Sequence, residues 1–134
     1  AMLATETVAA AFGPGAHAST FGGTPLVATA ALETLRLMVD EGIAARARET
    51  GDYFKAALEQ LKLHHRCILE VRGRGLLLGI RLDGPADDMV PILMEKGFLV
   101  NCVQGHTLRF VPPLIIQKAE IDELIRCLDT TLTR

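Results

Sequence analysis

Apolar residues recur at helical spacing in several parts of the chain. Residues 43–63 and 118–132 each place their apolar side chains on one face of a helix. Residues 5–11 predict a shorter helix. Such one-sided faces need other elements to cover them, so the pattern predicts helices packed on a shared core.

A further helix is predicted from its start and stop signals. Thr24 can cap free amides, and Pro25 at the first helical position loses no hydrogen bond. The helix should run to about Asp40, because Gly42 suits the left-handed residue that ends a helix.

The second half of the chain changes to the period of strands. Residues 70–82 predict one strand, because every second residue from Leu76 to Leu82 is a large apolar side chain. Residues 86–96 predict a short helix. Residues 98–103 and 107–111 predict two strands joined by the tight connection 104–106, which favours an antiparallel hairpin.

From residue 24 the predicted order is helix, helix, strand, helix, strand, strand, helix. This order favours an α+β fold, with a mostly antiparallel sheet and helices on one face. A chain of 134 residues is long enough for one such domain.

Composition narrows the classes of function. The net charge of -2 and the 4% of aromatic residues speak against binding to nucleic acid. No apolar run is long enough to span a membrane, and no signal peptide is recognisable. Three widely spaced cysteines favour reduced thiols in a cytoplasmic protein over a disulfide framework, and no metal site is expected.

One loop carries the residue types of an anion site. Ser19 and Thr20 offer hydroxyls, Gly22 and Gly23 allow close approach to the backbone, and a helix start follows. These features suit a phosphate group. The alternative is a capped loop in which the glycines serve only to turn the chain.

Arg109 is the second candidate, because an arginine in an apolar strand is costly to bury without a partner. Its guanidinium can bind a carboxylate with two hydrogen bonds. A structural ion pair with a nearby carboxylate is the alternative. Arg72 and Arg74 flank glycines in a way that resembles an anion nest, but we interpret them as part of a structural strand entry.

Three motifs together make the chain resemble a family. HASTFGGTPL (17–26), VRGRGLLLGIRL (71–82) and LRFVPPL (108–114) resemble, in order and spacing, the C-terminal portion of class III aminotransferases that use pyridoxal 5'-phosphate (PLP). The sequence around LRFVPPL is most similar to that of the acetylornithine type. Ala18 departs from the usual glycine of the first motif.

The resemblance implies a fold and a set of sites. Residues 1–23 would be the tail end of the large PLP-binding domain, and residues 24–134 the small domain of a fold-type I enzyme with its leading helix. Thr20, with Ser19 beside it, would bind the PLP phosphate in the neighbouring subunit of a homodimer. Arg109 would bind the α-carboxylate of the substrate.

The lysine that such an enzyme joins covalently to PLP is not recognisable here. Lys55, Lys62, Lys96 and Lys118 fall on or beside predicted helices, and the resemblance puts the catalytic lysine upstream. We therefore expect no catalytic residue in this chain, no PLP bound to it alone and no activity of its own.

The resemblance implies a reaction for the full-length parent. It would transfer the amino group of N-acetylornithine to 2-oxoglutarate, giving N-acetylglutamate semialdehyde and glutamate in arginine biosynthesis. Ornithine, succinylornithine or 4-aminobutyrate aminotransferase remain alternatives. A different alternative is an independent α+β module that binds anions at residues 19–25 and a carboxylate at Arg109.

Overall fold

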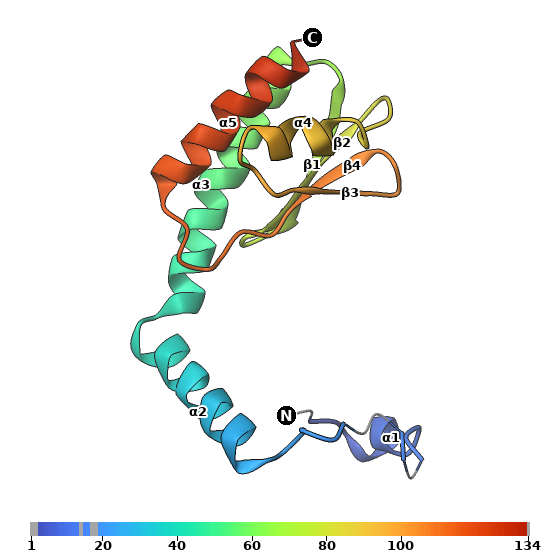
Figure 1. Cartoon of the computed structure of the whole chain (residues 1–134), viewed down its shortest axis with the longest axis vertical. Coiled ribbons are helices and arrows are strands. Elements are labelled where there is room, and N and C mark those ends of the chain that lie inside the picture. The colour runs from blue at the N-terminus through green and yellow to red at the C-terminus, as the bar shows by residue number, and fades with distance from the viewer. Residues whose placement is uncertain (1–2, 14, 17–18, 134) are drawn as a thin grey trace. The chain divides into compact units, whose positions relative to one another are not determined.

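The computed structural model describes residues 3–13, 15–16 and 19–133. The chain divides into two compact units, Ala1–Leu37 and Met38–Arg134, called here the N-terminal and the C-terminal unit. Figure 1 shows the elements of each. The predicted boundary after residue 23 concerns a longer protein and stays a prediction.

The N-terminal unit consists of helices and a loop. Helix α1 covers Glu6–Ala9, within the predicted 5–11, and helix α2 covers Pro25–Asp40, as predicted. The end of α2, from Met38, falls in the C-terminal unit. Gly42 adopts the left-handed conformation (φ 59°) expected of the residue that ends α2. Among the described residues of this unit none is buried.

The C-terminal unit contains a sheet and three helices. Helix α3 spans Ile43–His64, α4 spans Met89–Glu95 and α5 spans Lys118–Leu132. The four strands are β1 (Ile68–Arg74), β2 (Leu77–Leu82), β3 (Asn101–Val103) and β4 (Thr107–Phe110), in the order β1-β2-β4-β3. All paired strands are antiparallel, which confirms the predicted α+β class.

The single strand predicted over residues 70–82 is wrong. Arg74 pairs with Leu77, so the chain reverses through Gly75 (φ 55°) and Leu76, and the segment forms the hairpin β1–β2. Leu76 is buried although it lies in the turn. Its side chain therefore continued the apolar alternation and concealed the reversal.

A compact apolar core lies on one face of the sheet. Its buried side chains come from every helix of the C-terminal unit and from three strands, and include Phe54, Leu58, Ile80, Leu93, Leu108, Ile121 and Leu128. Burying one such side chain contributes about 1.5–3 kcal/mol. The core thus holds the strands that carry Arg109.

Helix α3 approaches the β1–β2 turn very closely. A Cβ atom added at Gly51 would lie 2.3 Å from the carbonyl oxygen of Gly75. Only glycine permits this contact without a shift of the backbone.

Helices α3 and α5 are also tied by polar contacts. The Tyr53 hydroxyl donates to Asp122 Oδ1 at 2.5 Å, and His65 Nε2 lies 2.7 Å from Asp129 Oδ1. The hydrogen bond with Asp122, followed by desolvation, raises the pKa of Tyr53 above 10.0.

Candidate functional site

The β3–β4 hairpin presents Arg109 on the sheet face opposite the core. The tight connection predicted at 104–106 is confirmed: Gln104 (φ 55°) and Gly105 (φ 71°) form the turn. Leu108 and Phe110 point into the core, so the alternation of the strand directs Arg109 to the other face.

Four residues stand in one row across this open face. Arg72 of β1 pairs with Gly79 of β2, Gly79 pairs with Arg109 of β4, and Arg109 pairs with Asn101 of β3. Strand pairing therefore places two arginines in the row with only a glycine between them.

Arg109 is exposed, so the premise that its charge is buried is wrong. Its Nε donates a hydrogen bond to Asn101 Oδ1 at 3.2 Å. Within residues 3–13, 15–16 and 19–133 it forms no ion pair, so the alternative of a structural ion pair finds no support there. Its guanidinium is thus held at Nε while its charge stays available to an anion.

Arg72 reaches across the sheet above Gly79. Its Nη2 donates to Thr107 Oγ1 on β4 at 3.3 Å. A Cβ at Gly79 would lie 3.3 Å from Cγ2 of the same threonine, so the missing side chain keeps this path open. Arg72, Gly79, Thr107 and Arg109 all line a hollow of about 320 Å³.

The loop of the first motif belongs to the N-terminal unit. Ser19 Oγ accepts the amide of Gly22 at 3.0 Å, and the Thr24 hydroxyl donates to the Phe21 carbonyl at 3.1 Å. Gly23 has a positive φ of 78°. His17 and Ala18 lie outside the described residues.

This loop fits the phosphate end of a cofactor in its chemistry. The Thr20 side chain is exposed, and the Ser19 hydroxyl, which accepts the Gly22 amide, also carries a proton that a hydroxyl can donate to an anion. Helix α2, which is 16 residues long, begins directly after the loop at Pro25 and adds the partial positive charge of its N-terminus. The loop lies in the N-terminal unit and Arg109 in the C-terminal unit.

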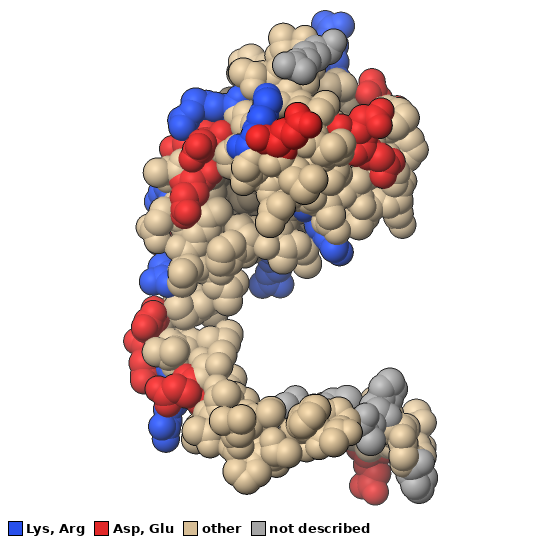
Figure 2. All heavy atoms as spheres, in the orientation of Figure 1, with Lys and Arg blue, Asp and Glu red and all other residues tan. Residues whose placement is uncertain are grey.

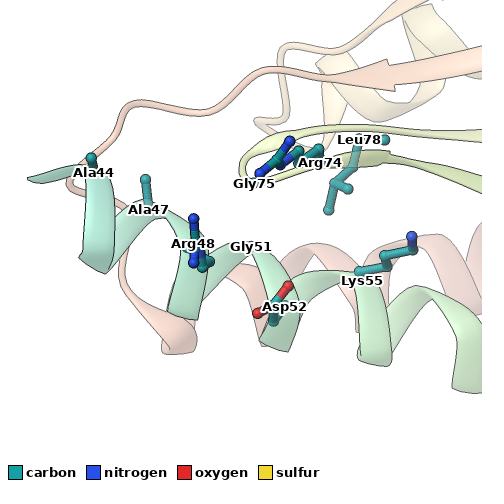
Figure 3. A pocket seen from close by; sticks show the side chains of 10 residues that line it. Ala44, Ala47, Arg48, Gly51, Asp52, Lys55, Arg74, Gly75 and Leu78 are labelled. Atoms are coloured by element: carbon teal, nitrogen blue, oxygen red, sulfur yellow. The ribbon is translucent and has the colours of Figure 1, made fainter.

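A second cavity holds three cationic side chains (Figure 3). Arg48 and Lys55 of α3 and Arg74 of β1 line about 400 Å³ together with Asp52. The sequence did not single out this group, because its members come together only where α3 meets the β1–β2 turn. The acidic Asp52 partly offsets their charge.

All four lysines of the chain lie on a helix or at a helix end. Lys55 and Lys62 lie on α3, and Lys96 ends α4 and donates to Thr131. Lys118 begins α5 and pairs with Glu49 at 3.2 Å. In the described part of the chain no group of three or more His, Cys, Asp or Glu side chains could hold a metal ion. Likewise, no described helix is both long and apolar enough to cross a membrane.

Sequence reasoning missed Asn101, which lies in the strand predicted over residues 98–103 and contacts Arg109 directly. The signal was its spacing: across a three-residue turn it lies eight positions before Arg109, which makes the two direct cross-strand neighbours.

Comparison with protein families and curated proteins gives consistent matches. The family model described as "Aminotransferase class-III" matches residues 1–132. The chain is 43% identical over 125 residues to acetylornithine aminotransferase of Methanothermobacter thermautotrophicus, covering 93% of this chain and 32% of that protein. It is 46% identical over 121 residues to ornithine aminotransferase 2 of Staphylococcus saprophyticus, covering 90% and 30% respectively.

Solved structures agree with these matches. The crystal structure of acetylornithine aminotransferase from Elizabethkingia anophelis superposes with a TM-score of 0.80 at 31% identity, covering 98% of this chain and 34% of that one. Ornithine δ-aminotransferase of Plasmodium falciparum gives a TM-score of 0.82 at 31% identity, over 98% and 35%. The chain spans about a third of the length of these relatives.

Proposed function

Because the chain belongs to the class III aminotransferase family, we propose that it forms the substrate-carboxylate-binding part of an enzyme that transfers the amino group of N-acetylornithine to 2-oxoglutarate. The products would be N-acetylglutamate semialdehyde and glutamate, in arginine biosynthesis. The observation that carries the proposal is Arg109, exposed and without an ion-pair partner among the described residues.

Arg109 would bind the α-carboxylate of the amino acid. The flat guanidinium matches the two carboxylate oxygens with parallel N–H···O bonds, which orients the substrate as well as holding it. Arg72 lines the same hollow and adds a second positive charge, which its pair with Glu70 at 4.0 Å partly offsets. Both charges would favour an anionic substrate.

Thr20 and Ser19 would hold the phosphate of PLP through their hydroxyls, together with the N-terminus of α2. By resemblance they would serve the neighbouring subunit of a homodimer. PLP, when bound, supplies the electron sink for the transamination. The lysine that joins it would lie outside the residues of this chain.

The names of the relatives leave the donor between acetylornithine and ornithine, and acetylornithine is the donor proposed. Succinylornithine and 4-aminobutyrate are further donors to compare. An independent ligand-binding module finds no support in a family match over residues 1–132. A cytoplasmic location is proposed as well, since the three cysteines are unpaired thiols.

Transamination by the full-length enzyme that contains this stretch tests the proposal. With 2-oxoglutarate as acceptor, kcat/KM should be highest for N-acetylornithine among the four donors. Arg109→Gln should lower kcat/KM by roughly 30-fold or more. Leaving the substrate carboxylate without its arginine partner weakens transition-state binding by about 2 kcal/mol or more.

Arg81→Gln is the matched control, because Arg81 is also exposed but is paired with Glu70 at 3.5 Å. It should leave kcat/KM nearly unchanged. Equal losses in both variants, or none in Arg109→Gln, would contradict the role of Arg109. The 134-residue chain with PLP should show no transamination, and turnover without added protein would refute that part.

A further inference from the structure

Asn101 contacts the side of Arg109 that a substrate does not need. The two residues are direct partners in the β3–β4 register, and Asn101 Oδ1 accepts the Nε proton of Arg109 at 3.2 Å. A guanidinium offers a carboxylate two pairs of donors: Nε with one terminal nitrogen, or the two terminal nitrogens together. The hydrogen bond to Asn101 occupies Nε and leaves the terminal pair.

Open space around Arg109 would let its side chain move, so the hydrogen bond at Nε has a conformation to restrain. Arg109 borders two hollows, one of about 320 Å³ that it shares with Thr107 and one of about 300 Å³ that it shares with Asn101. An exposed arginine has several flexible torsions and loses rotamer freedom when it binds. A cross-strand partner at Nε fixes much of that freedom before the ligand arrives.

We propose that Asn101 is a positioning residue: it holds Nε of Arg109 so that the two terminal nitrogens meet the substrate carboxylate end-on. This inference rests on the proposed function and names a second residue of the same site.

An amide is the fitting partner for this task. Asn101 accepts a hydrogen bond without carrying a charge, so the full positive charge of Arg109 remains for the ligand. An aspartate at this position would accept the same proton but would also neutralise the guanidinium and compete with the substrate carboxylate. Glu70, an acidic side chain of β1, is paired with Arg72 and Arg81 and not with Arg109.

Steady-state kinetics of the full-length enzyme that contains this stretch test the inference. Asn101→Ala should raise KM for the amino acid about 3- to 10-fold with kcat nearly unchanged, because the carboxylate is held equally in the ground and transition states. Asn101→Asp should raise KM by at least a further factor of about 10. Gln104→Ala, an exposed change in the turn of the same hairpin, should leave KM unchanged.

A merely structural role predicts a different pattern. Asn101→Ala and Asn101→Asp would then raise KM equally, or would lower kcat together with the free energy of unfolding. Either result overturns the inference. If Arg109→Gln also leaves KM unchanged, the proposed function fails. If Arg109→Gln raises KM but neither Asn101 variant does, only the inference on Asn101 fails.

A second measurement uses the 134-residue chain itself and does not depend on turnover. The NMR signal of the Arg109 Nε–H proton can be identified because it is missing from the spectrum of Arg109→Lys. In the wild type this proton should exchange slowly with water. It should exchange much faster in Asn101→Ala but not in Gln104→Ala. Equal exchange in all three proteins would overturn the hydrogen bond on which the inference depends.

Discussion

The two units of the chain differ in what holds their functional residues. The C-terminal unit has its own apolar core, and the strands that this core supports present Arg109 and Asn101. In the described part of the N-terminal unit no residue is buried, and apolar side chains of α2 such as Leu26 (81% exposed) and Leu35 (60% exposed) face outward. Figure 2 shows few charged side chains on that unit and many, of both signs, on the other.

The difference indicates that a buried core supports the residues around Arg109, whereas no buried residue supports the described part of the loop with Ser19 and Thr20. The geometry around Arg109 follows from strand register and core packing within one unit. Ser19 and Thr20 lie in a loop held by local hydrogen bonds, next to a helix with several exposed apolar side chains. We therefore expect the carboxylate site to survive in the isolated chain and the phosphate loop to depend on further protein.

The largest contrast is expected between two leucines. Leu128→Ala removes a fully buried side chain from the C-terminal unit and should lower the free energy of unfolding by about 2–5 kcal/mol. Leu35→Ala in α2 should change it by less than about 0.5 kcal/mol, because Leu35 is mostly exposed. Urea unfolding followed by circular dichroism measures both.

A large loss in Leu35→Ala would break the comparison. If that loss grew as the protein was diluted, the face of α2 would be covered by a second copy in solution.

Gly51 provides the next largest effect. Gly51→Ala places a Cβ 2.3 Å from the backbone of Gly75 and should destabilise the C-terminal unit by about 1–3 kcal/mol or more. Gly84→Ala is the matched control, because a Cβ there meets nothing within 4 Å and its φ is not positive. Equal unfolding midpoints for the two variants would show that the helix–turn contact is not tight in solution.

The smallest effect is a change in one titration. Tyr53 is the only tyrosine of the sequence, so phenolate absorbance reports on it alone. Its pKa should lie above 10.0 in the folded chain, because ionisation breaks the hydrogen bond to the Asp122 carboxylate. Asp122→Asn should lower this pKa towards 10.0, and the denatured chain should give the ordinary value.

The sign of the linked stability follows from that shift. A pKa raised on folding means that the Tyr53–Asp122 contact contributes fully below about pH 10 and is lost as the pH rises through the folded pKa. The stability difference between wild type and Tyr53→Phe should therefore shrink at alkaline pH. A difference that stays constant would mean that the two helices are not joined by this bond.

Much of the architecture was predictable from local signals. Start and stop residues predicted α2, and apolar periodicity predicted α3 and α5 within one residue of their observed ends. The β1–β2 turn was missed because Leu76, although in a turn, is apolar and buried like its neighbours. The exposure of Arg109 was also missed, because alternation sets Arg109 opposite Leu108 and Phe110 but does not say whether another layer covers that second face.

What the amino-acid sequence determined by itself is the set of helices, the antiparallel hairpin and the three motifs that mark the aminotransferase family. These depend on neighbours in the chain, whose spacing can be read directly. Only the tertiary structure decided that residues 68–82 fold back on themselves, that Arg109 faces away from the core, and that Asn101 holds its Nε. Those features depend on strand register, which brings together side chains on different strands and is set by the packing of the whole unit.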